Sequence, residues 1–442
     1  MSAAHWNERQ LHFVAIGGAG MSGLALVCHR LGATVTGTDR ADSSYMQRLR
    51  DAGLDPRIGH DADAVPEGAD VVFSTAIGKD NPEIVRAMER GQRLIHRGEL
   101  LAELCAERPL VAVAGTHGKT TTSAMIAHVL RATGASPAFL LGGELIGAGP
   151  NGEAINAEWG DGEWVVAEAD ESDGSFLRLH PEVAVVTNVE LDHHSRWSSR
   201  GELFEAFRSF CEQASGLALL DDPALNPICG EQRVVRFDTE KPGPELELRV
   251  PGRHNILNAR AALAALDLMG GPLSLEDAAK ALAEFPGVRR RLEPVGERDG
   301  ARVYSDYAHH PTEVAAALAA LRELEPRRLF AIFQPHLYSR TRMLGEELGA
   351  SLAAADEVIV LDVYAARGAP DPELAAELAR SVAAAAADRS GGRPVWWLRE
   401  AEDAKRAIAP RLREGDLVAV LGAGDVFLLA HELAGDPAPA SA

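Results

Sequence analysis

The stretch AVAGTHGKTTTS, residues 112–123, decides how the middle of this chain folds. It continues an apolar run that begins at Leu110, and it leads into the helix-favouring residues 124–127. This order predicts a strand, a glycine loop and a helix, with several backbone N–H groups converging at the positive end of that helix. Because Lys119 and the Thr120 hydroxyl complete such a cradle for phosphate and Mg²⁺, we expect a site for a nucleoside triphosphate.

The glycine loop departs from the common pattern G-x-x-x-x-G-K-[ST], since Val113 stands where the first glycine belongs. A tight strand-to-helix turn with an exposed lysine is the alternative interpretation. The strand before the loop and the helix after it favour phosphate binding. The cofactor-binding residues expected in this loop are Gly115, Thr116, His117, Gly118, Lys119, Thr120 and Thr121.

Length and composition fit a protein of several domains. The chain has 442 residues, 46% of them apolar, which predicts about two to four domains. Its apolar runs are much shorter than the roughly 20 residues of a membrane span, so we expect no membrane insertion. Residues 1–8 lack the features of a signal peptide and the four cysteines form no close pair, which favours the cytoplasm. A net charge of −21 argues against a nucleic-acid partner, and a monomer or a homodimer is expected.

The first hundred or so residues alternate strands with helices, an order typical of a parallel α/β sheet. Strands are expected at 12–16, 34–37 and 71–74, and helices at 21–31 and 81–90. The first strand leads into GGAGMSG, residues 17–23, which contains G-x-G-x-x-G, and Asp39 ends the next strand. This is a Rossmann-like nucleotide fingerprint.

The fingerprint alone leaves its nucleotide open. With NAD, Asp39 accepts a hydrogen bond from a ribose hydroxyl; with a UDP-sugar, the glycine loop holds the diphosphate equally well. Asp39 could also be a simple strand-end cap. A second phosphate loop, about a hundred residues later, favours a nucleotide-bearing substrate together with ATP.

Two further α/β blocks follow. Strands are expected at 164–167, 183–187 and 217–220, with a helix at 256–269, and then at 302–305, 329–333, 357–361, 395–398 and 417–421. The predicted fold is therefore α/β with three domains: a Rossmann-like domain over 1–107, a central P-loop ATPase domain over 108–287, and a doubly wound Rossmann-like domain over 288–442. The tail 435–442 is expected to be disordered.

Acidic residues follow one strand of the central block. Residues 168–173 read EADESD, and Glu168, nearest the strand, is the first candidate for a Mg²⁺ ligand beside Thr120. A solvated acidic turn describes at least two of the four carboxylates. The next strand ends in TNVELDHH, residues 187–194. Because magnesium prefers oxygen, chemistry alone makes His193 a hydrogen-bonding partner more readily than a metal ligand.

Polar side chains also gather later in the chain. Asn255 and Asn258 open a helix three residues apart and share a face, where amides can contact a base edge or act as ordinary helix-start residues. Three segments of the last block are dense in Arg, His and Asp at strand ends: 289–291, 305–313 and 334–342. Because the chain as a whole is so acidic, these segments indicate a face that binds anions.

Taken in order, these motifs resemble those of the Mur ligases, ATP-dependent enzymes that add amino acids to the peptidoglycan precursor. The pattern is most similar to the branch that acts on UDP-N-acetylmuramate and L-alanine. The resemblance extends from Ile16 to Asp425, and it is carried by residues 17–23, 115–122, 168–173, 252–258, 306–313 and 334–341, and by Asn188, Asp192 and His193.

The resemblance implies a role for each motif. Lys119 contacts the β and γ phosphates of ATP, and Thr120, Glu168 and His193 bind Mg²⁺. Asn255 and Asn258 lie beside adenine, and Arg290 and Asp306 complete the ATP site. The implied substrate-binding residues are Gly18, Ala19, Gly20, Met21, Ser22 and Asp39 for the sugar nucleotide, and His309, His336, Tyr338 and Arg340 where muramate and the amino acid meet. The implied catalytic residues are Lys119, His193, Arg290, Asp306 and His309.

The implied reaction couples ATP to amide formation. The lactyl carboxylate of UDP-N-acetylmuramate forms an acyl phosphate, and L-alanine displaces phosphate to give UDP-N-acetylmuramoyl-L-alanine. One alternative is the related ligase that recycles a whole tripeptide onto the same sugar nucleotide. Alternatives of another class are a nicotinamide-dependent dehydrogenase, which leaves Lys119 without a role, and a non-catalytic nucleotide-binding regulator.

Several positions depart from the family pattern. Leu337 stands where the family usually has Arg, Leu292 replaces a usual Phe, and residues 237–246 are short beside a β-rich excursion. Residues 191–195 also differ from the usual ending of this strand. Because Lys119, Glu168, His193 and Asp306 are all present, we interpret these differences as those of a divergent branch that keeps its activity.

Overall fold

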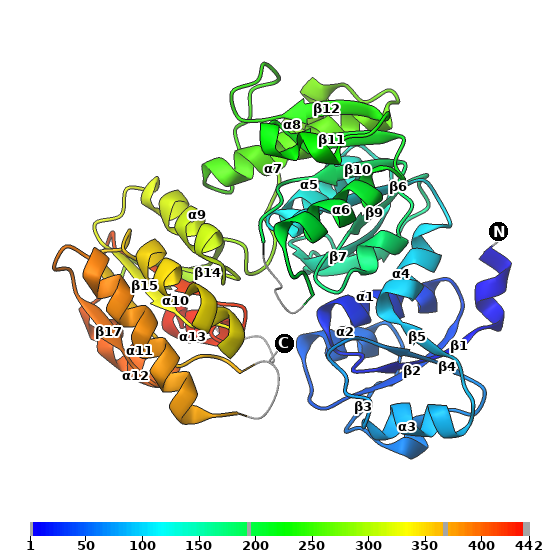
Figure 1. The fold of residues 1–442 in the computed structure, drawn as a ribbon, viewed down its shortest axis with the longest axis horizontal. Coiled ribbons are helices and arrows are strands. Elements are labelled where there is room, and N and C mark those ends of the chain that lie inside the picture. The colour runs from blue at the N-terminus through cyan, green and yellow to red at the C-terminus, as the bar shows by residue number, and fades with distance from the viewer. Residues whose placement is uncertain (1–2, 192–195, 366–369, 436–442) are drawn as a thin grey trace. The chain divides into compact units, whose positions relative to one another are not determined.

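The structure is a computed structural model, and it describes residues 3–191, 196–365 and 370–435. The chain forms two compact units, Met1–Arg249 with Asn255–Pro286, and Val250–His254 with Gly287–Ser441. It contains three mainly parallel sheets with helices between their strands, two in the first unit and one in the second (Figure 1). The predicted α/β class with three sheets is confirmed, whereas the domain limits 1–107, 108–287 and 288–442 stay a prediction.

The first sheet is parallel throughout, in the order β3-β2-β1-β4-β5. Its strands are β1 (Gln10–Val14), β2 (Thr34–Asp39), β3 (Arg57–Ile58), β4 (Asp70–Phe73) and β5 (Leu94–His96). Its helices are α1 (Ala19–Arg30), α2 (Ser44–Asp51), α3 (Pro82–Glu89) and α4 (Arg97–Cys105). β1 ends two residues before the predicted strand does, because Ala15 takes a φ of 63° and turns the chain into the glycine loop.

The second sheet has β6 (Leu110–Ala114) at its centre, in the order β12-β11-β10-β6-β9-β7-β8. The other strands are β7 (Ala138–Leu145), β8 (Ile155–Trp159), β9 (Val165–Glu168), β10 (Val183–Val186), β11 (Gly216–Leu220) and β12 (Arg233–Phe237). The helices are α5 (Lys119–Ala132), α6 (Arg200–Cys211), α7 (Arg253–Met269) and α8 (Leu275–Ala283). Every residue of β6 is buried, since sheet and helices cover it on both sides.

The first two sheets share a packed boundary inside the first unit. Helix α1 lies against β8, and a Cβ added to Gly23 would stand only 3.1 Å from the Cβ of Ala157. The Asn156 amide donates to the carbonyl of Ala19 at 2.5 Å, and Arg48 forms an ion pair with Glu144. These contacts tie the glycine loop of the first sheet to an edge of the second.

The third sheet is doubly wound, in the order β13-β14-β18-β15-β16-β17. Its strands are β13 (Glu293–Arg298), β14 (Ala301–Asp306), β15 (Leu329–Phe333), β16 (Glu357–Val360), β17 (Val395–Trp397) and β18 (Leu417–Leu421). One core packs α9 (Pro311–Arg322), α10 (Tyr338–Leu352) and α11 (Pro372–Arg389), and a separate core packs α12 (Ala401–Ile408) and α13 (Phe427–Ala434). Two cores on one sheet are what the doubly wound prediction requires.

Two expectations meet the limits of the structure. The tail predicted to be disordered, 435–442, lies outside the described residues except for Gly435, which ends α13. No helix among the described residues is long and apolar enough to cross a membrane.

A buried network of hydrogen bonds connects β1 and β2 of the first sheet with α3. Glu83, on α3, is 0% exposed and accepts hydrogen bonds from the Thr38 hydroxyl at 2.6 Å and the Asp61 N–H at 3.1 Å. Its carboxylate also meets a ring nitrogen of His12 and one of His60, each at 3.0 Å. Burial works against the charged carboxylate, but these hydrogen bonds outweigh it and lower the pKa of Glu83 below its ordinary value.

Replacing Glu83 by Gln should destabilise this sheet by about 3–5 kcal/mol at pH 7, since it removes one partner from a buried charged network. Hydrogen exchange of peptides covering β1 and β2 measures the effect, and Glu89→Gln, at an exposed position of the same helix, is the control. Because a lowered pKa adds stability above the unfolded-state value, the difference between wild type and Glu83→Gln should shrink as pH falls below about 4.5. Equal protection at pH 7 in both variants would contradict this account.

Candidate active site

The glycine loop after β6 adopts a backbone that only glycine accommodates at two positions. Gly115 has a φ of 132°, and a Cβ there would lie 2.1 Å from the Thr187 hydroxyl oxygen. Gly118 caps α5 with a φ of 82°, and a Cβ there would lie 2.4 Å from Oδ1 of Asn258. The predicted order of strand, loop and helix is therefore present. The side chains of Thr187 and Asn258 lie too close to the loop for any residue but glycine at these two positions.

Lys119 is the first residue of α5, and its ammonium group is almost enclosed. Nζ donates to the carbonyls of Gly115 at 2.6 Å and Thr116 at 3.1 Å, and it forms an ion pair with Oε2 of Glu171 at 2.9 Å. Burial disfavours the charged amine, but the nearby carboxylates, Glu171 foremost, outweigh that effect and raise the pKa of Lys119. Burial raises the pKa of Glu171 to about 7, against the pull of the lysine charge.

Thr120 and Glu168, both predicted to bind metal, lie together. The Thr120 hydroxyl donates to Oε2 of Glu168 at 2.8 Å, and the Gly142 N–H donates to the same oxygen at 2.9 Å. A Cβ on Gly142 would stand 2.6 Å from that oxygen, so the glycine leaves room for the carboxylate. His193, the third predicted ligand, lies outside the described residues.

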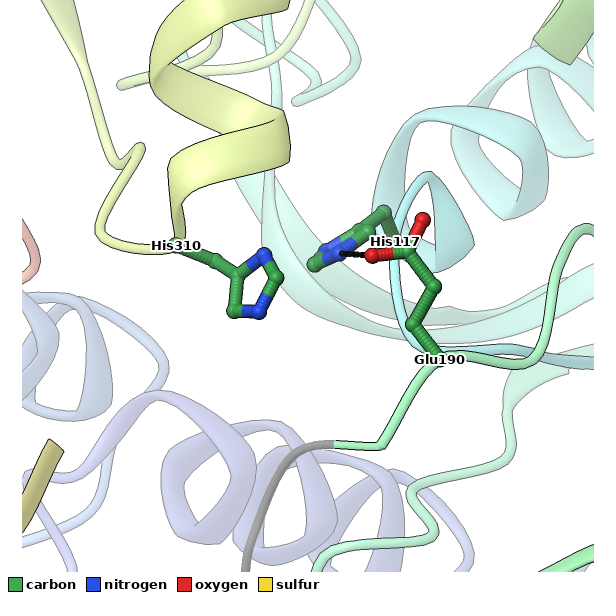
Figure 2. A group of neighbouring side chains, drawn as sticks. All are labelled: His117, Glu190 and His310. Carbon is green, nitrogen blue, oxygen red and sulfur yellow. Dashed lines mark ion pairs between the residues drawn. The ribbon is translucent and has the colours of Figure 1, made fainter. Parts of the chain in front are cut away.

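The residues after β10 hold the other side of the loop. The Thr116 hydroxyl bonds to the backbone of Glu190, and the Asn188 side chain both accepts from the His117 N–H at 2.9 Å and donates to the His117 carbonyl at 3.0 Å. The His117 ring faces the Glu190 carboxylate at 3.5 Å (Figure 2). Sequence reasoning missed Glu190, although its place in a polar run after a buried strand was a usable signal.

The two amides of α7 lie on one face, as their spacing predicts. Asn258 accepts from the Thr122 hydroxyl at 3.4 Å and donates to the side-chain oxygen of Asn255 at 3.3 Å. Both asparagines and Thr121 are buried beside the glycine loop. The structure thus brings together the described loop, metal and amide residues that were predicted for the first unit.

The glycine loop of the first sheet is held by Asp39. Oδ2 of Asp39 accepts from the Gly17 N–H at 2.9 Å, so this carboxylate shapes the loop directly. Gly18 caps α1, and Ala19 and Gly20 begin that helix with their backbones. Met21 and Ser22 are buried, and the Ser22 N–H donates to the Gly18 carbonyl at 2.8 Å.

In the second unit, Arg290 lies beside the residue that follows Asp306, since the Tyr307 N–H donates to the Arg290 carbonyl at 2.7 Å. Asp306 is buried and accepts from the N–H groups of Leu292 and Ala308, each at 2.7 Å. Burial raises the pKa of Asp306 to about 6, although the charge of Arg291 opposes the shift. Arg290 donates to the carbonyls of Gly422 at 3.0 Å and Gly424 at 2.7 Å.

A ring cluster follows β14 and β15 in the same unit. The His309 ring packs edge-on against Tyr307 and His336, and His336 stacks on Tyr364. Buried Arg340 approaches Nδ1 of His336 at 3.3 Å. Three of the four predicted residues, His309, His336 and Arg340, are therefore adjacent.

The fourth predicted residue of this group and a neighbouring histidine are held by local hydrogen bonds. The Tyr338 hydroxyl donates to the Asp371 carbonyl at 3.1 Å and accepts from the Asp371 N–H at 2.9 Å. His310, also labelled in Figure 2, caps α9 in a capping box with Glu313.

Two departures from the family pattern fall at unusual backbone angles. Leu337 has a φ of 70° and Leu292 a φ of 46°, a region that favours glycine. Leu337 is the N-cap of α10, between His336 and Tyr338, and Leu292 donates its N–H to Asp306. Both substitutions therefore lie in strained turns beside predicted site residues.

Family models match three parts of the chain. The catalytic domain of the Mur ligase family matches residues 10–109, the Mur ligase middle domain residues 113–243, and the glutamate ligase domain residues 290–424. Two UDP-N-acetylmuramate–L-alanine ligases are similar over nearly the whole chain. The relative from Symbiobacterium thermophilum is 44% identical, covering 96% of this chain and 94% of its own, and that from Nocardioides is 41% identical, covering 96% of both.

Solved structures give the same picture of the fold. The UDP-N-acetylmuramate-alanine ligase of Thermotoga maritima superposes with a TM-score of 0.81 at 29% identity, over 96% of this chain and 98% of that one. A murein peptide ligase from Psychrobacter arcticus, 23% identical, has a TM-score of 0.70 over 96% and 98% and shares the fold. With three family domains in order and full-length relatives above 40% identity, the chain belongs to the Mur ligase family of ATP-dependent ligases.

Proposed function

We propose that this protein joins L-alanine to the lactyl carboxylate of UDP-N-acetylmuramate, with ATP as the energy source. The observation that carries the proposal is the Lys119 loop, with its glycines, threonines and surrounding carboxylates, in a chain whose full-length relatives are named for this reaction. A dehydrogenase would leave this loop without a role. The four free cysteines, three of them buried, support a reducing cytoplasm.

The residues at the loop suit ATP with Mg²⁺. The cradle offers backbone N–H groups at the start of α5 and a fully charged lysine, which fits a polyphosphate. Thr120 and Glu168 present oxygen atoms to one point, as magnesium prefers, and we propose His193 as a further ligand. When bound, the metal neutralises charge on the phosphate oxygens.

The reaction needs activation, because a carboxylate has no adequate leaving group for an amine to displace. In the proposed sequence, a lactyl carboxylate oxygen attacks the γ-phosphorus, the bond to ADP breaks, and an acyl phosphate forms. The neutral amine of L-alanine then attacks the acyl carbon, inorganic phosphate leaves, and the amine proton passes to a base, for which we propose His309. Lys119 stabilises the charge that develops on the γ-phosphate oxygens.

For Lys119 to do this, its Nζ must exchange partners. In the structure it donates to two loop carbonyls and to Glu171. A phosphate oxygen offers a stronger acceptor than the carbonyls, so nucleotide binding should draw the ammonium group outward. Glu171, whose pKa is raised to about 7, then tolerates the loss of its partner by taking up a proton.

We further propose roles for the remaining residues predicted from the sequence. Asn255 and Asn258 are proposed to face the adenine, and Arg290 and Asp306 are proposed to contribute to ATP binding. The proposed substrate contacts are Gly18, Ala19, Gly20, Met21, Ser22 and Asp39 for the sugar nucleotide, and His309, His336, Tyr338 and Arg340 for muramate and the amino acid. Asp39 acts through the backbone it holds, since its carboxylate already accepts from Gly17.

Gly118→Ala should weaken ATP binding by at least about tenfold, because the added methyl group displaces Asn258 and strains the loop. Gly134→Ala is the matched control: this glycine follows the other end of α5 with a φ of 81°, and a Cβ there meets nothing within 4 Å. Both variants carry similar backbone strain. Calorimetric titration with ATP therefore distinguishes a loss of affinity caused by the altered loop from one caused by lower stability of the fold. Equal ATP affinity in the two variants would remove the loop from the nucleotide site.

The choice of amine tests the proposed reaction itself. Purified enzyme with ATP, Mg²⁺ and UDP-N-acetylmuramate should release phosphate rapidly with L-alanine and slowly with the tripeptide L-Ala-γ-D-Glu-meso-diaminopimelate. Phosphate release is measured for each amine separately, with UDP-N-acetylmuramate omitted as the control. Faster release with the tripeptide would assign the protein to the recycling reaction of the murein peptide ligases.

A further inference from the structure

Arg97 stands where the first two sheets of the first unit meet. It is the first residue of α4, directly after β5, and the His96 ring caps this helix by accepting from the Gly98 N–H at 3.2 Å. A Cβ on Gly98 would lie 2.3 Å from the Cβ of Ser175, so α4 packs closely against the turn Ser175–Arg178 that follows the acidic run. These contacts fix the position of the Arg97 backbone at the start of α4.

The two arms of the Arg97 guanidinium face different groups. Nη2 donates to Oδ2 of Asp170 at 2.8 Å and to Oδ2 of Asp173 at 3.2 Å. Nη1 lies 3.5 Å from the point where a Cβ of Gly20 would be, beside the glycine loop of the first sheet. The side chain is 24% exposed, and among the described residues its recorded hydrogen bonds all come from Nη2. Nη1 therefore has donors to offer a ligand at that loop.

Asp170 connects Arg97 with the ATP loop. Asp170 accepts from Nη2 of Arg97 at 2.8 Å, and it directly precedes Glu171 in the chain. Lys119 in turn forms its ion pair with the neighbouring Glu171. Removing Arg97 would leave Asp170 with Lys119 as its main cationic neighbour, which would hold the lysine away from phosphate.

We propose that Arg97 is a substrate-binding residue that serves both nucleotide sites: Nη1 binds the diphosphate of the sugar nucleotide at Gly20, while Nη2 neutralises Asp170 and so keeps Lys119 available to ATP. This inference rests on the proposed function for the identity of the sugar nucleotide. Asp173 is a positioning residue here, because it aims the guanidinium without contacting the ligand.

The two roles predict different effects of charge and shape. Arg97→Met removes both the positive charge and the two-armed guanidinium. UDP should therefore bind about 10- to 100-fold more weakly, and ATP several-fold more weakly, as expected for loss of a charge-assisted hydrogen bond. Arg97→Lys keeps a positive charge near Asp170 but has no second arm. It should restore ATP affinity while UDP binding stays weak.

Calorimetric titration of the full chain with UDP alone and with ATP measures both effects without relying on turnover. Arg93→Met, which removes a more exposed arginine just before β5 that pairs with Glu99 of α4, is the matched control and should change neither affinity. Asp173→Asn should weaken UDP binding in the wild-type background and have no further effect in Arg97→Met. Thermal unfolding checks that each variant folds. If Arg97→Met does not fold, Arg97→Lys tests the UDP contact in its place.

Unchanged UDP affinity in a folded Arg97→Met variant would overturn the diphosphate contact, and unchanged ATP affinity would overturn the link to Lys119. Equal recovery of both affinities in Arg97→Lys would overturn the two-armed arrangement. Because UDP binding is measured directly, these outcomes stay separate from the proposed function, which fails instead if wild-type enzyme does not turn over UDP-N-acetylmuramate.

Discussion

The buried charge of Lys119 is the constraint on which the centre of this structure depends. A charge taken out of water costs several kcal/mol unless partners surround it, and here the loop carbonyls and Glu171 do so. Those partners require the acidic run to turn back over the loop directly after β9. This acidic turn also depends on Arg97, because it is the one cation among the described residues that lies within 3.2 Å of Asp170 and Asp173. The ATP loop, the acidic turn and the edge of the first sheet therefore form one electrostatic unit.

Such a unit suits an enzyme that must bind a polyanion and release it again. Lys119 and Arg97 face four carboxylates in residues 168–173, so the run carries an excess of negative charge. In the proposed mechanism, magnesium arriving with ATP would compensate that excess, whereas the carboxylates hold the lysine in the structure. The glycines at 115, 118 and 142 leave space for this exchange, because a Cβ at any of them would collide with a partner side chain.

Local patterns predicted much of this arrangement. The strand, loop and helix around Lys119 were predicted from a run of 12 residues, and β18 has the predicted bounds Leu417–Leu421. Contacts between distant segments could not be predicted in this way. The antiparallel pairing of β7 with β8 was missed, since Gly142 and Gly143 interrupt the strand pattern. Arg97 gave no signal, because its partners stand more than 70 residues away, at positions 170 and 173.

The most direct test of the account is the fate of the carboxylate oxygen. UDP-N-acetylmuramate labelled with ¹⁸O in its lactyl carboxylate is turned over with ATP, Mg²⁺ and L-alanine, and the released phosphate is analysed by mass spectrometry. Attack of the carboxylate on the γ-phosphorus transfers one labelled oxygen, so the account predicts one ¹⁸O in each phosphate released. Unlabelled phosphate, at full yield of the amide product, would contradict carboxylate activation at the Lys119 loop.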